Sequence, residues 1–314
     1  MFDIVRRRYW YFGLSLLVIV PGLVVLGMNW AENPAQGPLP LAIDFTGGTL
    51  LELQFSEAAQ PLQPADVRAV YEEHGFPDST VQTSGADIAI IRSKALDETQ
   101  QPAIIAALEK TYGPHTLLNA ATVGPSVGAE VARSAALAVG MAAVGILLYI
   151  WLAFRRLEHA WRYGVCAIIA MLHDVLVVVG AAAIFGRLFG WQVDALFLTA
   201  LLTVASFSVH DTIVVFDRIR ENLVIHRRLD YEAVVNHSIV QTLDRSINTQ
   251  FTVMLTLLAL ALFGGVTIRH FVVTLLIGVF SGTYSSIFNA APLLVVWENR
   301  EWANLFRRNR PAEA

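Results

Sequence analysis

Long apolar stretches separated by polar segments dominate the pattern of this chain. A helix rises about 1.5 Å per residue and the hydrocarbon core of a bilayer is about 30 Å thick, so a spanning helix needs roughly 17–25 apolar residues. Six stretches meet that requirement, at residues 10–28, 135–154, 163–185, 195–216, 247–263 and 271–296. The pattern predicts six transmembrane helices with one large polar insertion, between the first and the second.

The insertion has the mixed periodicity of a small α+β domain. Strand-like segments lie at residues 49–55, 80–83, 87–92 and 115–123. One helix is expected to begin at Pro64 and end at Gly75, and another to run from a cap at Asp97 to Gly113. The order β-α-β-β-α-β is that of a ferredoxin-like unit. The expected fold is therefore an α-helical membrane protein, with a ferredoxin-like domain inserted between helices 1 and 2.

The first apolar stretch allows two interpretations. Arg6, Arg7 and Arg8 precede it, as basic residues precede the core of a secretory signal peptide. The stretch is longer than the ~7–15-residue core of a signal, however, and no small-x-small cleavage site follows Met28. We favour an uncleaved membrane anchor.

Composition agrees with a membrane protein and predicts its orientation. Only 15% of the residues are charged, whereas a soluble domain usually carries about 25%. Residues 31–130 hold 13 Asp and Glu against 4 Lys and Arg. With the N-terminus in the cytoplasm, 15 of the 22 Lys and Arg residues fall in inside segments, as the positive-inside rule requires. Both termini are therefore expected in the cytoplasm and residues 31–130 outside.

The expected domains follow from these assignments. They are a tail with the first helix (1–30), the external domain (31–130), a bundle of five helices (131–298) that includes a cytoplasmic loop (217–245), and a cytoplasmic tail (299–314). The single cysteine, Cys166, excludes an internal disulfide, and neither a metal-ligand cluster nor a phosphate-binding loop is present in the sequence. We expect no enzyme activity, no cofactor or metal, and no nucleic-acid partner.

One carboxylate interrupts the fourth apolar stretch. Asp211 lies where a charged side chain costs at least ~2.5 kcal/mol on insertion scales, so such a residue usually marks a proton, ion or substrate path. The alternative is a structural polar residue that is bonded to a neighbouring helix. We favour a functional role, because a carboxylate is a costly way to make that contact.

A cation close to Asp211 would allow the carboxylate to change its protonation state. Burial favours the neutral form of an aspartate and a nearby cation favours the ionised form, so moving the cation moves the proton. Arg245, at the cytoplasmic start of the fifth stretch, is long enough to reach toward that depth. It is equally an ordinary anchor that extends to the lipid headgroups, and the residues alone leave both roles open.

Four more residues in the apolar stretches are candidates for supporting roles. His210 points about 100° away from Asp211 on a helix, and we expect it to hydrogen-bond a neighbouring helix rather than to titrate. Asp174 is a second intramembrane carboxylate, and its role is either a contact between helices or part of the same relay. Gly278 and Gly282 form a GxxxG pattern, which permits close helix packing.

Several motifs, in order along the chain, resemble those of the SecF family of bacterial protein export. They are Asp44-Phe45-Thr46-Gly47-Gly48-Thr49, residues 123–128, His173-Asp174-Val175, residues 209–222, residues 241–249, Phe263-Gly264-Gly265 and residues 282–287. The resemblance covers nearly the whole chain. It implies one half of an RND-type unit in the bacterial plasma (inner) membrane, completed by SecD as partner. It also implies work with the SecYEG channel and its accessory subunits, in which the proton gradient drives unfolded preproteins outward at a late stage of translocation.

The resemblance also assigns roles to residues. It implies that Asp211 and Arg245 form the proton path. The chain departs from the family pattern at His210, where the family usually has Asn, and at Asp244, where it usually has Ser; the second change adds an anion beside Arg245. Two other functions stay open. One is an RND-like small-molecule exporter, for which a single α+β domain is thin, and the other is a passive scaffold that stabilises SecD.

Overall fold

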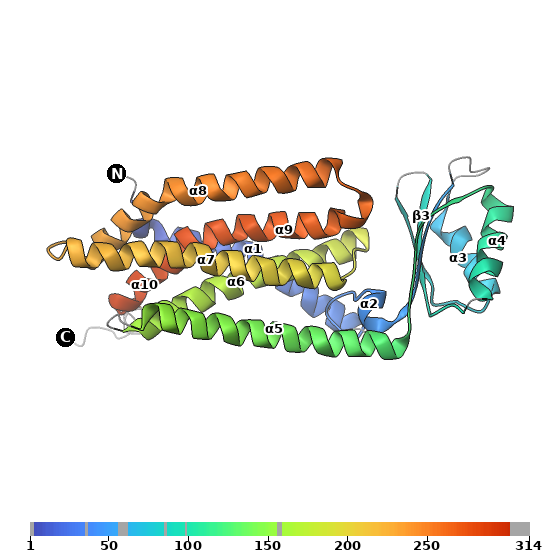
Figure 1. Cartoon of the computed structure of the whole chain (residues 1–314), viewed down its shortest axis with the longest axis horizontal. Helices are drawn as coiled ribbons and strands as arrows, with labels where there is room; N and C mark the ends of the chain where they lie inside the picture. The colour runs from blue at the N-terminus through green and yellow to red at the C-terminus, as the bar shows by residue number, and fades with distance from the viewer. Residues whose placement is uncertain are drawn as a thin grey trace, which may run out of the picture. The chain divides into compact units, whose positions relative to one another are not determined.

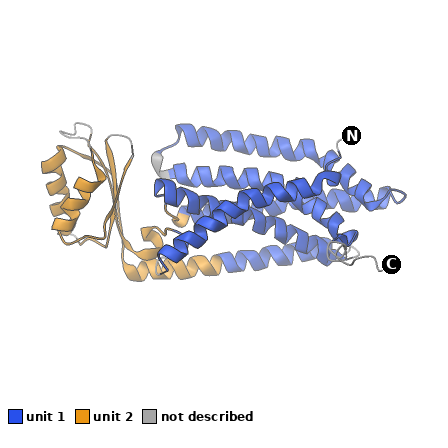
Figure 2. Ribbon diagram, turned by 180° about the vertical axis from the view of Figure 1, so that it is seen from behind, with its two compact units in different colours: residues 1–39, 139–191, 196–314 blue, residues 40–138, 192–195 orange. Residues whose placement is uncertain are grey.

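The chain divides into two compact units. The computed structural model describes residues 3–34, 37–55, 62–84, 87–97, 99–155 and 159–301. Unit 1 comprises residues 1–39, 139–191 and 196–314, and unit 2 comprises residues 40–138 and 192–195 (Figure 2). The sequence analysis placed the external domain at 31–130. Unit 2 begins at residue 40, continues to 138, and also includes the short segment 192–195, which is distant in the chain.

Six helices within the described residues are long and apolar enough to cross a membrane, as the hydropathy pattern predicts. The elements that form them are the 3-10 turn η1 (Val5–Arg7) with α1 (Arg8–Glu32), α5 (Pro125–Phe154), α6 (Ala160–Phe189), α7 (Ala195–Ile225), α8 (Tyr231–Phe263), and α9 (Val266–Ser285) with the π-helical turn η2 (Ser286–Ala290) and α10 (Ala291–Glu298) (Figure 1). The last three elements follow one another without a break and make one span.

The helices are longer than the apolar stretches that predicted them. The loop expected over residues 217–245 is mostly helix, because α7 continues to Ile225 and α8 begins at Tyr231. The polar side chains of these extensions satisfy one another: Asn222 Nδ2 donates to Ser238 Oγ and to Gln241 Oε1, each at 2.9 Å. Hydropathy therefore identified the part of each helix that suits lipid and missed the helical ends beyond it.

Burial separates inner from outer helices in unit 1. In their most apolar windows, between 39% and 50% of the residues of α6, α7 and the α9–α10 span are buried, against 11–17% in α1, α5 and α8. At one point α1 and α6 come into backbone contact: a Cβ added to Gly22 would lie 2.5 Å from the Cα of Gly180. Glycine at both positions is what allows this approach.

Unit 2 holds the predicted α+β domain. Strands β1 (Gly48–Gln54), β2 (Thr80–Ser84), β3 (Ile88–Ser93) and β4 (Thr116–Val123) form an antiparallel sheet in the order β2-β3-β1-β4. Helices α3 (Pro64–Glu73) and α4 (Gln100–Tyr112) follow β1 and β3 along the chain and pack on the same face of the sheet (Figure 1). This order and topology confirm the ferredoxin-like arrangement.

The core of unit 2 explains why these segments fold as they do. Alternate residues of β1 point to the helical face, so that Leu51 and Leu53 are fully buried. They meet the buried face of α3, which carries Val67 and Tyr71, and that of α4, which carries Leu108. A short helix, α2 (Ile43–Thr46), leads into β1. The period-two and period-3.6 patterns of the sequence thus converge on one apolar layer.

Candidate functional site

Asp211 lies on the buried side of α7 and has an uncharged partner. The buried positions of α7 recur every three or four residues, and Asp211 falls on this stripe with 4% of its surface exposed. Gln250 of α8, also buried, donates from Nε2 to Asp211 Oδ2 at 2.9 Å. The sequence-based reasoning missed Gln250, although a glutamine inside an apolar span is itself a signal of a contact between helices.

Arg245 does not meet Asp211 in this structure. Its side chain is exposed, as is that of Asp244, and no ion pair joins Arg245 to Asp211, two residues that the structure describes. The reason is the rotation of α8: Arg245 and Gln250 are five residues apart and hence about 140° apart around the helix. With Gln250 turned to α7, Arg245 lies on another face of α8.

His210 lies outside the buried stripe of α7. Its side chain is exposed, consistent with the turn of about 100° from Asp211. Within the described part of the chain it makes no hydrogen bond to a neighbouring helix, so that expected contact is not formed here.

Asp174, at the middle of α6, is fully buried and has three donors. Ser281 Oγ donates to Oδ1 and Ser285 Oγ to Oδ2, both at 2.6 Å, and His173 Nδ1 lies 2.9 Å from Oδ1. The two serines stand one turn apart on α9, so the carboxylate joins α6 to α9. The spacing of these serines was the signal that the sequence-based reasoning did not use.

The glycine pattern of α9 faces α7 at both positions. A Cβ added to Gly278 would lie 2.0 Å from Val204 Cγ2, which is a severe overlap. A Cβ added to Gly282 would be 3.5 Å from the Cα of Ser208 and 3.7 Å from Asp174 Oδ2, both ordinary contact distances. Gly278 therefore permits the close approach of α9 and α7, whereas Gly282 lies where α6, α7 and α9 converge.

The turn η2 follows Ser285 directly and ties α9 to α1. Asn289 Nδ2 donates to Ser15 Oγ at 2.7 Å, and Tyr284 Oη donates to the carbonyl of Tyr11 at 2.7 Å. π-helical turns are rare and are frequent at functional sites. Here the turn follows directly after Ser285, one of the residues that donate hydrogen bonds to Asp174.

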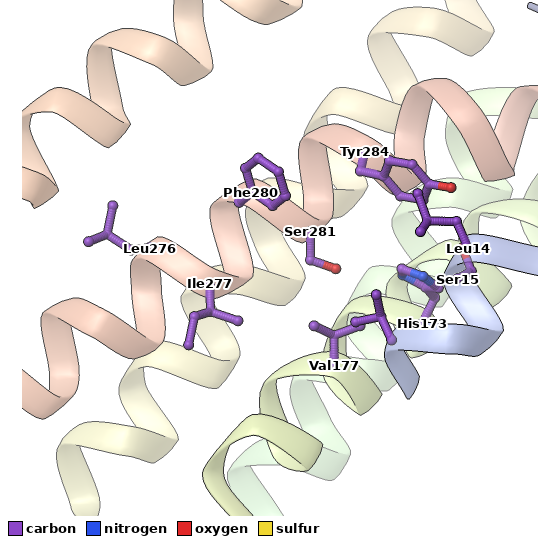
Figure 3. Close-up of a pocket in the computed structure, with 10 residues that line it drawn as sticks. Leu14, Ser15, His173, Val177, Leu276, Ile277, Phe280, Ser281 and Tyr284 are labelled. Carbon is purple, nitrogen blue, oxygen red and sulfur yellow. The ribbon is translucent and has the colours of Figure 1, made fainter. Parts of the chain in front are cut away.

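An apolar cavity of about 520 Å³ opens between α1, α6 and α9 (Figure 3). Figure 3 shows Leu276, Ile277 and Phe280 of α9 along one side and Val177 of α6 opposite. Ser281 and His173 also line it, yet their polar groups are directed to Asp174. The cavity thus extends to His173 and Ser281, the side chains that hydrogen-bond to Asp174. Its mostly apolar lining suits a hydrocarbon chain rather than a charged molecule.

Two family models match the chain. The one described as "Protein export membrane protein SecD/SecF, C-terminal" matches residues 103–300, and the one described as "SecD/SecF GG Motif" matches residues 35–59. Together they cover both the helices that hold Asp174 and Asp211 and the segment that leads into β1.

Full-length relatives agree with these matches. The chain is 52% identical to a protein translocase subunit SecF of Anaerolinea thermophila over 317 residues, which covers all of both chains. It is 48% identical to the SecF subunit of Thermobaculum terrenum, over 100% of this chain and 99% of that one.

Solved structures share the fold. A crystal structure of SecDF, a translocon-associated membrane protein from Thermus thermophilus, superposes with a TM-score of 0.81 at 33% identity and covers 95% of this chain. SecDF in a super-membrane-facing form gives a TM-score of 0.64 at 32% identity. This chain spans 39% and 40% of the length of those two chains. The protein therefore belongs to the SecD/SecF family of protein export membrane proteins, as a SecF-type translocase subunit.

Proposed function

We propose that this subunit uses the proton gradient to promote a late stage of preprotein export, with Asp211 as the group that takes up and releases the proton. The observation that carries the proposal is the contrast between the two buried aspartates: among the described residues Asp211 has one donor, the neutral amide of Gln250, whereas two serines donate to Asp174. A carboxylate has about four acceptor positions, so Asp211 retains the capacity to bind a proton or to meet a cation.

Arg245 is the cation that we assign to the second state of the site. When it approaches Asp211, its charge favours the ionised form and the proton leaves; when it withdraws, burial favours the neutral form. Asp244, its exposed neighbour, competes for the arginine, and His210 acts on Asp211 from the outer side of α7. Asp174, with its donors already in place, supports the site by holding α6 to α9.

Orientation in the membrane forms part of the same proposal. The protein resides in a bacterial plasma membrane with both termini in the cytoplasm and the α+β domain outside. The basic residues support this: Arg8 pairs with Glu232 and Glu301, and Arg162 pairs with Glu298, near the ends of helices that the positive-inside rule assigns to the cytoplasm.

The family implies one partner, SecD, and we propose the others. Association with SecD is implied by the SecD/SecF family and by the SecDF structures, and a SecF subunit is a transport component rather than an enzyme. We further assign contact with the SecYEG channel and its accessory subunits, with membrane lipid, and with the unfolded preprotein as it emerges.

The variant Asp211→Asn tests the proposal, because asparagine keeps the size of the side chain and cannot ionise. With SecD in vesicles, we expect it to abolish the part of translocation that depends on the proton gradient while the SecD complex still assembles. Asp217→Asn is the matched control, since Asp217 is an exposed carboxylate on the same helix, paired with Arg220 at 2.6 Å.

Gradient-dependent export at the wild-type level in Asp211→Asn would refute the proposal. If Arg245→Ala also exported normally while deletion of the whole subunit did not, the subunit would be a scaffold for SecD.

A further inference from the structure

The segment Asp44-Phe45-Thr46-Gly47-Gly48 is tied to the loop before α7. The backbone pairs as a parallel bridge: Ala42 N–H donates to the carbonyl of Val193, and Val193 N–H donates to the carbonyl of Pro40, both at 2.8 Å. One side chain adds to this bridge, because Asp44 Oδ2 accepts the backbone N–H of Ala195 at 2.9 Å. These contacts join positions about 150 residues apart in the chain, all within unit 2.

Ala195 is the first residue of α7. The N–H groups of a first helical turn have no partner within the helix, and a carboxylate there is stabilised by the helix dipole as well as by the hydrogen bond. Asp44 therefore holds the end of the helix that carries Asp211. Sixteen residues separate Ala195 from Asp211, so a shift or rotation of α7 is transmitted over roughly 24 Å.

The other end of the segment, Gly47-Gly48, leads directly into strand β1 and is closely packed. Gly47 has φ +74° and Gly48 has φ +137°, values that favour glycine, and Gly48 begins the central strand β1. A Cβ on Gly47 would lie 2.8 Å from the Cα of Pro125, and one on Gly128 would lie 2.7 Å from the nitrogen of Gly47. Because the backbone packs this closely, the segment moves together with β1 and the first turn of α5.

We propose that Asp44 is a positioning residue that couples α7 to the α+β domain, so that a change at Asp211 moves that domain. This rests on the proposed function, since it assigns the transmission of the proton step and not the step itself. Asp44 does not touch the proton site; it acts through α7. The bridge at residues 41 and 193 keeps the two backbones in register while the carboxylate holds the helix end.

The test separates proton flow from export. Vesicles that contain the subunit with SecD are assayed for proton flux with an internal pH dye, and for the gradient-dependent part of preprotein translocation. Asp44→Ala is expected to keep the proton flux of the wild type and to lose about tenfold in gradient-dependent translocation, the factor that corresponds to ~1.4 kcal/mol. Asp44→Asn retains an acceptor oxygen and is expected to fall between the two.

Asp97→Ala is the matched control, because Asp97 makes the same kind of contact at a different helix. Its Oδ1 accepts the N–H of Gln100, the first residue of α4, at 2.8 Å. Loss of that cap weakens α4 within the domain and leaves α7 untouched. Translocation and proton flux are expected to stay at the wild-type ratio in Asp97→Ala.

A cross-link tests whether the tie between the two backbones is what translocation needs when proton flux is unchanged. Leu41→Cys with Val193→Cys places thiols on paired backbones about 4.7–4.9 Å apart, within the range of a disulfide, and the one native cysteine, Cys166, is buried. In the Asp44→Ala background the oxidised pair is expected to restore translocation, and a reductant to remove it again.

The outcomes distinguish this proposal from the proposed function. Full gradient-dependent translocation in Asp44→Ala, or proton flux and translocation that fall together without rescue by the cross-link, overturns the coupling role. If Asp211→Asn keeps gradient-dependent export while Asp44→Ala loses it and the cross-link restores it, the proton site lies elsewhere and the coupling role of Asp44 stands.

Discussion

Asp174 and Asp211 are both buried among apolar helices, and their surroundings differ. Asp174 receives three donors from α6 and α9, whereas Asp211 receives one amide. In both sites a partner of the carboxylate keeps a buried atom without a hydrogen-bond partner among the described residues: Gln250 Oε1 at Asp211 and His173 Nε2 at Asp174.

The difference teaches that burial of a carboxylate does not by itself indicate its role. A carboxylate whose acceptor positions are filled from two helices holds those helices together, and moving it requires breaking several hydrogen bonds at once. A carboxylate with one neutral partner can exchange that partner at small cost. The number and charge of the donors, rather than depth, divide structural from functional acids here.

The largest expected effect is on stability, from Asp174→Ala. It leaves Ser281 and His173 without their acceptor and leaves Ser285 only a 3.3 Å contact to the carbonyl of Gly282, and each buried unpaired donor costs roughly 1–3 kcal/mol, so we expect a loss of about 3 kcal/mol or more. Asp211→Asn should cost less than about 1 kcal/mol, in line with the small value of single hydrogen bonds between membrane helices. Unfolding of the full chain by denaturant in lipid–detergent micelles measures both, and equal losses would erase the distinction between the two sites.

The glycines of α9 give a second, smaller contrast. Gly278→Ala forces a methyl group onto Val204 and is expected to cost about 1–3 kcal/mol, as overpacking usually does. Gly282→Ala places its methyl at contact distance from Ser208 and Asp174 and should stay within about 0.5 kcal/mol. The same unfolding assay compares them. A larger loss for Gly282→Ala would mean that the region between the two carboxylates has no room for a methyl group.

The smallest expected effect concerns a third carboxylate, Glu301, which lies outside the spans and forms an ion pair with Arg8. Glu301 accepts hydrogen bonds from Arg8 and from Tyr9, the latter at 2.7 Å. Burial favours its neutral form, but these hydrogen bonds outweigh burial and hold the pKa of Glu301 below its ordinary value. Because the folded pKa is the lower one, the stabilisation is complete above the ordinary pKa and is lost as the pH falls toward the folded value.

Acid unfolding of the wild type beside Glu301→Gln measures this term. The stability difference between the two proteins should shrink as the pH falls below the ordinary glutamate pKa. A difference that stays constant with pH would show that the Arg8–Glu301 pair contributes through packing rather than charge.

Much of the architecture was predictable because it depends on local periodicity. The alternation that buries Leu51 and Leu53 predicts a strand, and the apolar runs predict the spans. The helical ends were not predictable from hydropathy, since Asn222 and Gln241 are polar and yet satisfy each other within helix. Pro64 and Gly113 predicted helix limits because their backbone preferences are local, and Asp97 did so because its side chain accepts the N–H of Gln100, the first residue of α4.

The site was predictable only in part. An aspartate in an apolar stretch is visible in the sequence as a cost, so Asp174 and Asp211 could be singled out from residue type and position alone. Their partners could not. Gln250 is 39 residues from Asp211, and Ser281 is 107 residues from Asp174.

Composition, charge bias and periodicity were therefore sufficient for the number of spans, the α+β insertion and the two candidate acids, because each of these is a property of a short segment. Which groups face those acids depends on how each helix is rotated about its axis and on which helices are neighbours. The rotation of α8 turns Gln250 rather than Arg245 to Asp211, and the bridge at Val193 brings Asp44 to α7. Such contacts arise from the packing of the whole chain, in which many distant side chains must fit at once.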